Sequence, residues 1–99
     1  MIYISGPITG TTDYIERFEK TEKSLRDKGY IPINPAKVNA QLPPETSYDM
    51  YMKMSLTMID LCDSIYMLPG WKKSKGACLE KAYAQATGKS VIIRKCYHG

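Results

Sequence analysis

Short apolar segments alternate with longer helix-like segments along the whole chain. Two parallel strands need a crossover connection of about a dozen residues or more, and a helix usually supplies it. The order strand, helix, strand, helix, strand, helix, strand therefore predicts an α/β fold, a flavodoxin- or Rossmann-like three-layer sandwich with a four-stranded parallel sheet and right-handed crossovers. The expected strands are residues 1–5, 30–33, 63–69 and 90–94, and the expected helices run from about residue 11 to 28, 47 to 61 and 75 to 87.

Local signals mark the ends of these elements. A cap at Thr11 or Thr12 is expected to begin the first helix, and Gly29 is expected to end it. Pro32 indicates an edge strand or a strand start, because proline donates no ladder hydrogen bond. A proline-bearing loop is expected over residues 34–44.

The length and composition indicate one ordinary globular domain. A chain of 99 residues is long enough for one sheet with helices and too short for a second core, so residues 1–99 are expected to form a single domain. The N-terminus shows no basic and apolar leader, and no stretch approaches the ~20 apolar residues that span a bilayer. The expected location is therefore the cytoplasm, with no membrane as a partner.

The cysteines and the histidine do not form a metal-binding pattern. Cys62, Cys78 and Cys96 are an odd number without the spacing of metal ligands, and His98 is the single histidine. We expect reduced thiols, two of them in the core, and neither a metal nor a cofactor.

The net charge of +4 and the pI near 9.0 are compatible with a nucleic acid or with a small anionic ligand. The basic residues are scattered and are mixed with acidic residues on the first helix. Scattered charge favours the small ligand.

The segment from Leu68 to Glu80 carries the most functional information. It runs from a strand end through a tight turn into a helix, which is where α/β proteins bind ligands. Ser74 can cap the helix and Gly76 lets a ligand approach the backbone, so the N–H groups there are expected to face an anion such as phosphate. Glu80 would lie one turn deeper.

Lysines crowd the start of the same helix. Lys72, Lys73 and Lys75 lie at the positive end of the helix dipole, where each cation is unfavourable by about 0.3–1 kcal/mol. A locally unfavourable arrangement indicates function. The alternative interpretation is a solvated loop of lysines.

The carboxyl ends of the predicted strands gather further candidates at one edge of the sheet. Trp71 could stack on a base or only cover the helix end, and Asn34 with Pro35 could contact a ligand or only make a turn. The candidate substrate-binding residues are Gly6, Pro7, Asn34, Gly70, Trp71, Ser74 and Gly76.

Two motifs together resemble the nucleoside 2-deoxyribosyltransferase superfamily, which includes the 2′-deoxynucleoside 5′-phosphate N-hydrolases. The first motif is Tyr3-Ile-Ser-Gly-Pro-Ile-Thr-Gly10, and the second is Asp63 followed by Ser74-Lys-Gly-Ala-Cys-Leu-Glu80. The resemblance spans nearly the whole chain. It implies that Glu80 is the nucleophile, that Tyr3 lies beside the sugar and the nucleophile, and that Gly6, Ser74 and Gly76 belong to phosphate- or sugar-binding turns.

The chain departs from the superfamily at one position. Members place an aspartate eight residues before the position of Asp63, where it assists departure of the base, and this chain has Ser55. Asp60 lies about 140° further round the same helix and Asp49 about 120° away, so neither simply substitutes. A serine cannot supply an acid of tuned pKa.

The sequence therefore supports two main hypotheses of function. The first is an enzyme that cleaves or transfers at the N-glycosidic bond of a (deoxy)nucleoside or a nucleoside 5′-monophosphate. The second is a non-catalytic nucleotide-binding or sensing module. A nucleic-acid-binding protein is disfavoured, because the chain lacks a basic helix or an aromatic-basic stripe. The Met- and Tyr-rich segment 47–61 predicts core packing or a subunit interface, and we expect a homo-oligomer.

Overall fold

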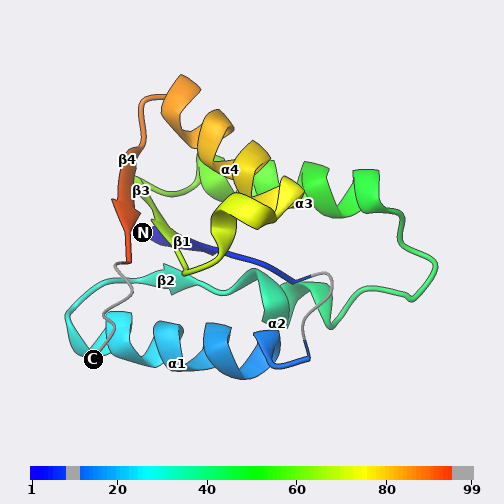
Figure 1. Ribbon diagram of the computed structural model, residues 1–99, viewed down its shortest axis with the longest axis horizontal. Helices are drawn as coiled ribbons and strands as arrows, with labels where there is room; N and C mark the ends of the chain where they lie inside the picture. The colour runs from blue at the N-terminus through cyan, green and yellow to red at the C-terminus, as the bar shows by residue number, and fades with distance from the viewer. Residues whose placement is uncertain (9–11, 95–99) are drawn as a thin grey trace.

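The computed structural model describes residues 1–8 and 12–94 and shows a sheet in which all neighbouring strands are parallel (Figure 1). The strand order is β2-β1-β3-β4. The chain leaves β1 toward β2 on one side and continues through β3 to β4 on the other, so the order reverses between β1 and β3. Ligands of open parallel sheets bind beyond the carboxyl ends of the strands at such a reversal. The strands are β1 (Ile2–Ser5), β2 (Pro32–Ile33), β3 (Ser64–Met67) and β4 (Ser90–Ile93).

Helices cover both faces of the sheet, which confirms the predicted three-layer α/β sandwich. In Figure 1, α1 and α2 lie below the sheet and α3 and α4 lie above it. A short 3-10 helix, η1, precedes α4. The bounds are α1 (Tyr14–Asp27), α2 (Pro35–Asn39), α3 (Tyr48–Asp60), η1 (Trp71–Lys73) and α4 (Lys75–Ala86).

The two cores follow from the alternation of side chains along β1. Ile2 and Ile4 join the cluster with Phe18 of α1, whereas Tyr3 between them joins the cluster with Ile59 of α3. Each cluster buries one apolar stripe of the helices on its side. The sheet is thus held from both faces, and Tyr3 is directed toward α3 and α4.

Two local features differ from the sequence-based expectation. The segment after β2 is the helix α2 in place of a loop, because Asn34 Oδ1 accepts a hydrogen bond from Ala36 N (3.0 Å) and Pro35 fits the first helical position. Helix α1 has Asp13 at its N-cap position with no side-chain cap bond, so the prediction of a cap at Thr12 is wrong. Thr11, the other predicted cap, lies outside the described residues.

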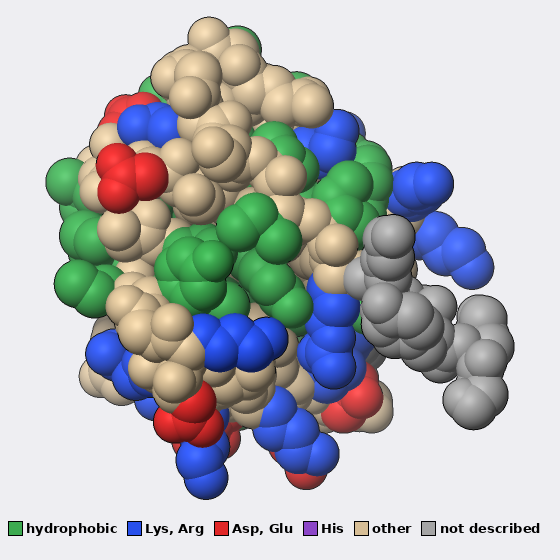
Figure 2. All heavy atoms as spheres, turned by 90° about the vertical axis from the view of Figure 1, so that its left-hand side faces the viewer, with side chains coloured by type: hydrophobic (Ala, Val, Ile, Leu, Met, Phe, Trp, Pro, Cys, Tyr) green, Lys and Arg blue, Asp and Glu red, His purple; other side chains and the backbone are tan. Residues whose placement is uncertain are grey.

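Strand β4 forms an edge of the sheet. Figure 2 views the molecule from the side of β4 and shows hydrophobic side chains exposed between lysines and arginines. Ile93 at the end of β4 is 48% exposed. Positive charge around an exposed edge discourages unspecific strand pairing.

The cysteines and the search for membrane-spanning helices concern residues 1–8 and 12–94. Cys62 is buried and Cys78 is half-buried, and both are free thiols, whereas Cys96 and His98 lie outside the described residues. Within those residues, no helix has both the length and the hydropathy required to cross a membrane.

Gly6 directly after β1 is packed too closely for a side chain. A Cβ atom at this position would lie 2.9 Å from Leu68 Cβ, which is closer than carbon atoms normally approach. We expect Gly6→Ala to lower the free energy of unfolding by about 1–3 kcal/mol, the usual cost of overpacking. Urea denaturation measures the change. The matched control is Gly76→Ala, where the nearest atom would be at 3.5 Å, and equal losses in both variants would contradict the packing argument.

Candidate active site

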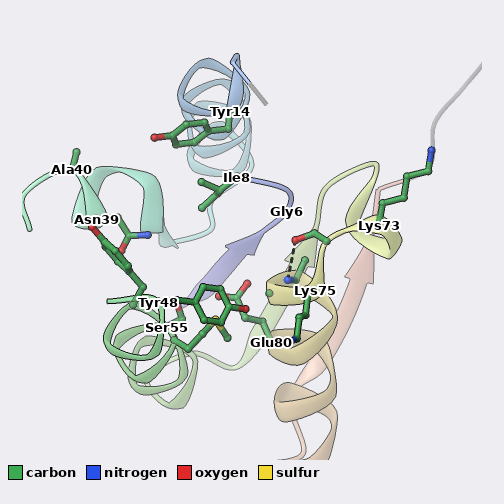
Figure 3. Close-up of a pocket in the computed structure, with 15 residues that line it drawn as sticks. Gly6, Ile8, Tyr14, Asn39, Ala40, Tyr48, Ser55, Lys73, Lys75 and Glu80 are labelled. Atoms are coloured by element: carbon green, nitrogen blue, oxygen red, sulfur yellow. Dashed lines mark hydrogen bonds between the residues drawn. The ribbon is translucent and has the colours of Figure 1, made fainter. Parts of the chain in front are cut away.

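A cavity of about 880 Å³ lies between α3, the start of α4 and the segment that follows β1 (Figure 3). This is the carboxyl edge of the sheet at the point where the strand order reverses, as the sequence predicts for a binding cleft. Its volume is in the range of sites for small molecules. The lining residues are Gly6, Ile8, Tyr14, Asn39, Ala40, Tyr48, Tyr51, Met52, Ser55, Lys73, Ser74, Lys75, Gly76, Ala77 and Glu80.

Glu80 is a buried carboxylate held by two hydroxyl groups. The hydroxyl of Tyr3 donates to Glu80 Oε2 at 2.6 Å, and the hydroxyl of Ser5 donates to Oε1 at 2.7 Å. Glu80 is 7% exposed, and none of the ion pairs among the described residues includes it. A buried carboxylate without a cation partner is costly for folding and is therefore a candidate functional group. We call Tyr3, Ser5, Ser55 and Glu80 the Glu80 cluster.

Simple local rules place the members of this cluster. Tyr3 and Ser5 are two residues apart on β1 and so point to the same face of the sheet. Ser74 accepts a hydrogen bond from Ala77 N at 3.2 Å and begins α4, so Glu80 lies in the second turn of that helix. The packing of α4 against β1 and β3 then brings Glu80 over the end of β1.

Burial raises the pKa of Glu80 above its usual value of 4.5, although hydrogen bonds from Tyr3, Ser5 and Ser55 oppose that shift. Burial, followed by the nearby charge of Glu80, raises the pKa of Tyr3 well above 10.0. Tyr3 therefore keeps its proton and remains a donor. The ionised Glu80 is poorly solvated, which leaves its oxygens reactive toward an electrophilic carbon in the cavity.

The raised pKa of Glu80 also predicts how stability depends on pH. Folding favours the protonated carboxyl, so this stabilisation is complete below the usual pKa of 4.5 and is lost as the pH rises through the higher folded value. The glutamine of Glu80→Gln cannot ionise. The melting temperature of this variant should therefore rise relative to that of the native chain as the pH increases. Thermal melts from about pH 4 to about pH 9 measure the difference. A difference that does not change with pH would count against a raised pKa.

Four of the residues predicted from the sequence lie in the cavity wall: Gly6, Ser74, Gly76 and Glu80. Tyr3 does not line the cavity and reaches it through its hydrogen bond to Glu80. Gly76 faces α3, since a Cβ atom there would lie 3.5 Å from the hydroxyl oxygen of Tyr48. The structure thus brings the two motifs of the resemblance together around one carboxylate.

Pro7 and Gly70 lie beside each other outside the cavity lining. Gly70 has φ +87° at the start of η1, and a Cβ atom there would lie 3.4 Å from Pro7 Cγ. The left-handed backbone at Gly70 favours glycine and makes the turn from β3 into η1.

Trp71 and Asn34 also lie away from the cavity wall, and both have local partners. The Trp71 ring packs on the core below α4 and has Lys81 Nζ at 5.1 Å from its centroid. Asn34 is buried, caps α2 and donates from Nδ2 to Glu22 Oε1 at 3.2 Å. Trp71 therefore packs on the core, and Asn34 caps a helix instead of making the predicted turn.

Sequence reasoning missed several residues of the site. Ser5 shares the face of Tyr3, and this spacing was a signal that could have identified it. The cavity lining also includes Tyr48 and Tyr51 from α3, which we call the tyrosine wall, and Tyr14 from α1. Figure 3 shows Tyr48 beside Glu80 and Tyr14 further away, beyond Ile8. No local pattern in the sequence relates α1 to α3, so these tyrosines could not be assigned to one site in advance.

Ser55 stands where the resemblance leads us to expect an aspartate. It is 5% exposed, lines the cavity and hydrogen-bonds with Tyr3 and Glu80. Asp60 instead accepts a hydrogen bond from Tyr83 at 2.6 Å, and Asp49 is exposed at the start of α3. Neither aspartate lines the cavity. Within the part of the chain that the structure describes, no group of three or more acidic, cysteine or histidine side chains could hold a metal ion.

Comparison with known families identifies the chain. Residues 1–93 match the model of the family described as "Domain of unknown function (DUF4406)", so the chain belongs to this family. The matched range includes the whole Glu80 cluster and every residue of the cavity lining. No curated protein matches the sequence.

Proposed function

We propose that this DUF4406 chain cleaves or transfers at the N-glycosidic bond of a nucleoside or nucleoside 5′-monophosphate, with Glu80 as the nucleophile. This is the chemistry of the nucleoside 2-deoxyribosyltransferase superfamily, which the two motifs resemble. The single observation that carries the proposal is the buried Glu80 carboxylate, which lines a cavity of small-molecule size and is oriented by Tyr3 and Ser5.

The geometry suits a double displacement at the anomeric carbon. One oxygen of Glu80 attacks C1′ as an oxocarbenium-like state develops, and a glycosyl-enzyme ester forms while the base departs. Water or a second base then attacks C1′ from the opposite face, which gives overall retention. Tyr3 and Ser5 hold the carboxylate in position, and burial keeps it weakly solvated.

A 5′-phosphate would lie at the start of α4. The first N–H groups of a helix have no partner within the helix and favour an anion. Ser74, Lys75 and Gly76 provide this turn and line the cavity one helical turn from Glu80. Lys75, which is unfavourable for the helix dipole, lines the cavity and is favourable for a phosphate bound there.

The second candidate function is a nucleotide-binding or sensing module without turnover. The observation that favours it is Ser55, because a hydroxyl in place of a carboxyl leaves the departing base without an acid. Binding of a nucleotide without any release of base would support this candidate over the enzyme.

We also propose that the chain works as a homo-oligomer with no nucleic-acid partner. Tyr48, Met50 and Leu61 remain exposed on or beside α3, where the sequence predicts core packing or an interface. Exposed apolar side chains on one helix are typical of a subunit contact. Sedimentation equilibrium measures the oligomeric state.

The proposed activity can be tested directly with the native chain. The chain is incubated with deoxynucleosides, ribonucleosides and their 5′-monophosphates, and chromatography measures the released base. Mass spectrometry of the quenched reaction tests for a sugar adduct on the peptide that contains Glu80. We expect release from at least one 5′-monophosphate, and absence of release and of the adduct across the panel would overturn cleavage of these neutral bases.

Gly76 offers a way to separate binding from stability. In Gly76→Ala, a methyl group would enter the cavity between the Tyr48 hydroxyl at 3.5 Å and Met52 Sδ at 3.8 Å. Because alanine is favoured over glycine in a helix by about 0.5–1 kcal/mol, stability should be equal or slightly higher. Binding of a 5′-monophosphate should weaken by about tenfold or more, which is ~1.4 kcal/mol. Calorimetry checks both values, and undiminished binding would show that the ligand lies elsewhere.

A further inference from the structure

The cavity lining contains a single carboxyl group and no imidazole. Among the described residues of the wall, Glu80 is the one side chain of either kind. The proposed function uses Glu80 as the nucleophile, and its two oxygens already accept hydrogen bonds from Tyr3 and Ser5. The described wall therefore holds the nucleophile without an imidazole or a second carboxyl group, the two kinds of side chain that most often protonate a leaving base.

The need for such an acid depends on the charge of the base. A neutral purine or pyrimidine leaves as an anion unless a proton reaches it, so an acid lowers its barrier. A base whose ring nitrogen is quaternised already carries a positive charge. When its glycosidic bond breaks, the electron pair of that bond neutralises the ring, and no proton is needed.

Aromatic side chains in the cavity suit a cationic ring. Tyr48 and Tyr51, the tyrosine wall, line the cavity together with Tyr14, and aromatic faces attract cations that approach them within about 6 Å of the ring centroid. In Figure 3 the ring of Tyr48 extends from α3 toward α4 and Glu80, whereas the side chain of Lys73 extends away from both. The negative Glu80 and the tyrosine wall thus face the same space.

From these observations, and resting on the proposed function, we propose that the site takes N-glycosides of a cationic base, such as a pyridinium or an N7-alkylated purine, and releases that base as a neutral molecule. In the first step, the bond from Glu80 to C1′ forms and the C1′–N bond breaks, with its electron pair passing to the ring. In the second step, water attacks C1′, a proton goes to solvent and Glu80 is restored.

A matched pair of substrates tests this inference. 7-Methylguanosine 5′-monophosphate and guanosine 5′-monophosphate share their sugar and phosphate and differ by one methyl group and one charge. Base release is followed by chromatography for both, and for nicotinamide mononucleotide as a pyridinium example, after subtraction of the rate without protein. We expect kcat/KM to be higher for the methylated nucleotide by about 10²-fold or more, the contribution of a missing acid.

Each outcome decides between the inference and the proposed function. Equal or faster release from guanosine 5′-monophosphate would overturn the cationic substrate class and leave the N-glycosidase standing. No release from any of the three, with no adduct on Glu80, would overturn both.

The tyrosine wall has its own readout. Tyr48 is 51% exposed, so its replacement should not prevent folding. Tyr48→Leu should raise KM for the methylated nucleotide by about twofold to fivefold and should affect guanosine 5′-monophosphate less. Tyr48→Phe keeps the aromatic ring, so its KM for the methylated nucleotide should equal that of the native chain. Equal effects of Tyr48→Leu on both nucleotides would show that the wall does not recognise charge.

Discussion

Replacement of Glu80 by glutamine is expected to lower base release by on the order of 10⁴-fold or more, because an amide is a poor nucleophile toward C1′. No covalent sugar adduct should form. Nucleotide binding should survive, since the amide has nearly the shape of the carboxylate and can still accept a hydrogen bond from Tyr3. Chromatography of the released base and mass spectrometry of the protein measure the two effects.

The stability of the same variant excludes a trivial explanation for the loss. A variant that melts no lower than the native chain at neutral pH cannot be inactive through unfolding. The raised pKa of Glu80 predicts that the melting temperature of the variant rises relative to that of the native chain as the pH increases. Glu45→Gln makes the same change in charge at an exposed residue and serves as the matched control. Full activity of Glu80→Gln would remove Glu80 from the chemistry.

The architecture could be predicted from the sequence because its signals are local. Helix caps at Ser47 and Ser74 and helix ends at Gly29 and Gly88 separate the helices from short apolar strands. Strands that alternate with helices predict crossover connections, and a parallel sheet follows from these connections. The predicted helix starts at Ser47 and Ser74 are confirmed, since both hydroxyls accept hydrogen bonds from the first turns of α3 and α4. Each cap hydrogen bond joins residues three positions apart, so these helix starts can be predicted without knowledge of the rest of the fold.

Prediction from sequence fails where one residue pair fits two local structures. Asn34 followed by Pro35 predicts the start of a loop, yet the same pair is a good cap and first position for a helix. The choice for α2 is supported by the packing of Ala36 into the core beside Phe18. This contact joins segments that are distant in sequence, and no local pattern could reveal it.

The candidate site was only half visible in the sequence for the same reason. The resemblance placed Tyr3 and Glu80 in one site, although 77 residues separate them. By contrast, the three tyrosines of the cavity lining meet only because α1 and α3 pack on opposite sides of β1, which is a tertiary property. Trp71 is an example of a residue that the sequence places beside the binding turn but that does not line the cavity. Its ring packs on the core, where an apolar surface is available.

The second large effect is expected at Ser55. Ser55→Asp would place a carboxyl group beside the buried carboxylate of Glu80, and two carboxyls that share a buried site cannot both ionise easily. One of them should hold a proton at neutral pH and so become the acid that the cavity lacks. For a neutral base such as guanine, we expect base release to increase by about 10²–10⁴-fold. The cost should be a lower melting temperature, because a second carboxyl is buried.

Ser55→Asn is the matched control, because asparagine has nearly the shape of aspartate and cannot transfer a proton as an acid. If the gain comes from proton donation, Ser55→Asn should show none of it, and the gain of Ser55→Asp should fall as the pH rises and the shared proton is lost. An equal gain in both variants would assign the effect to the shape of the cavity. Absence of base release from both variants and from the native chain, together with tight binding of one nucleotide, would identify the module as a sensor. In that case Ser55→Asp would have supplied the acid, and the site would still not release a base.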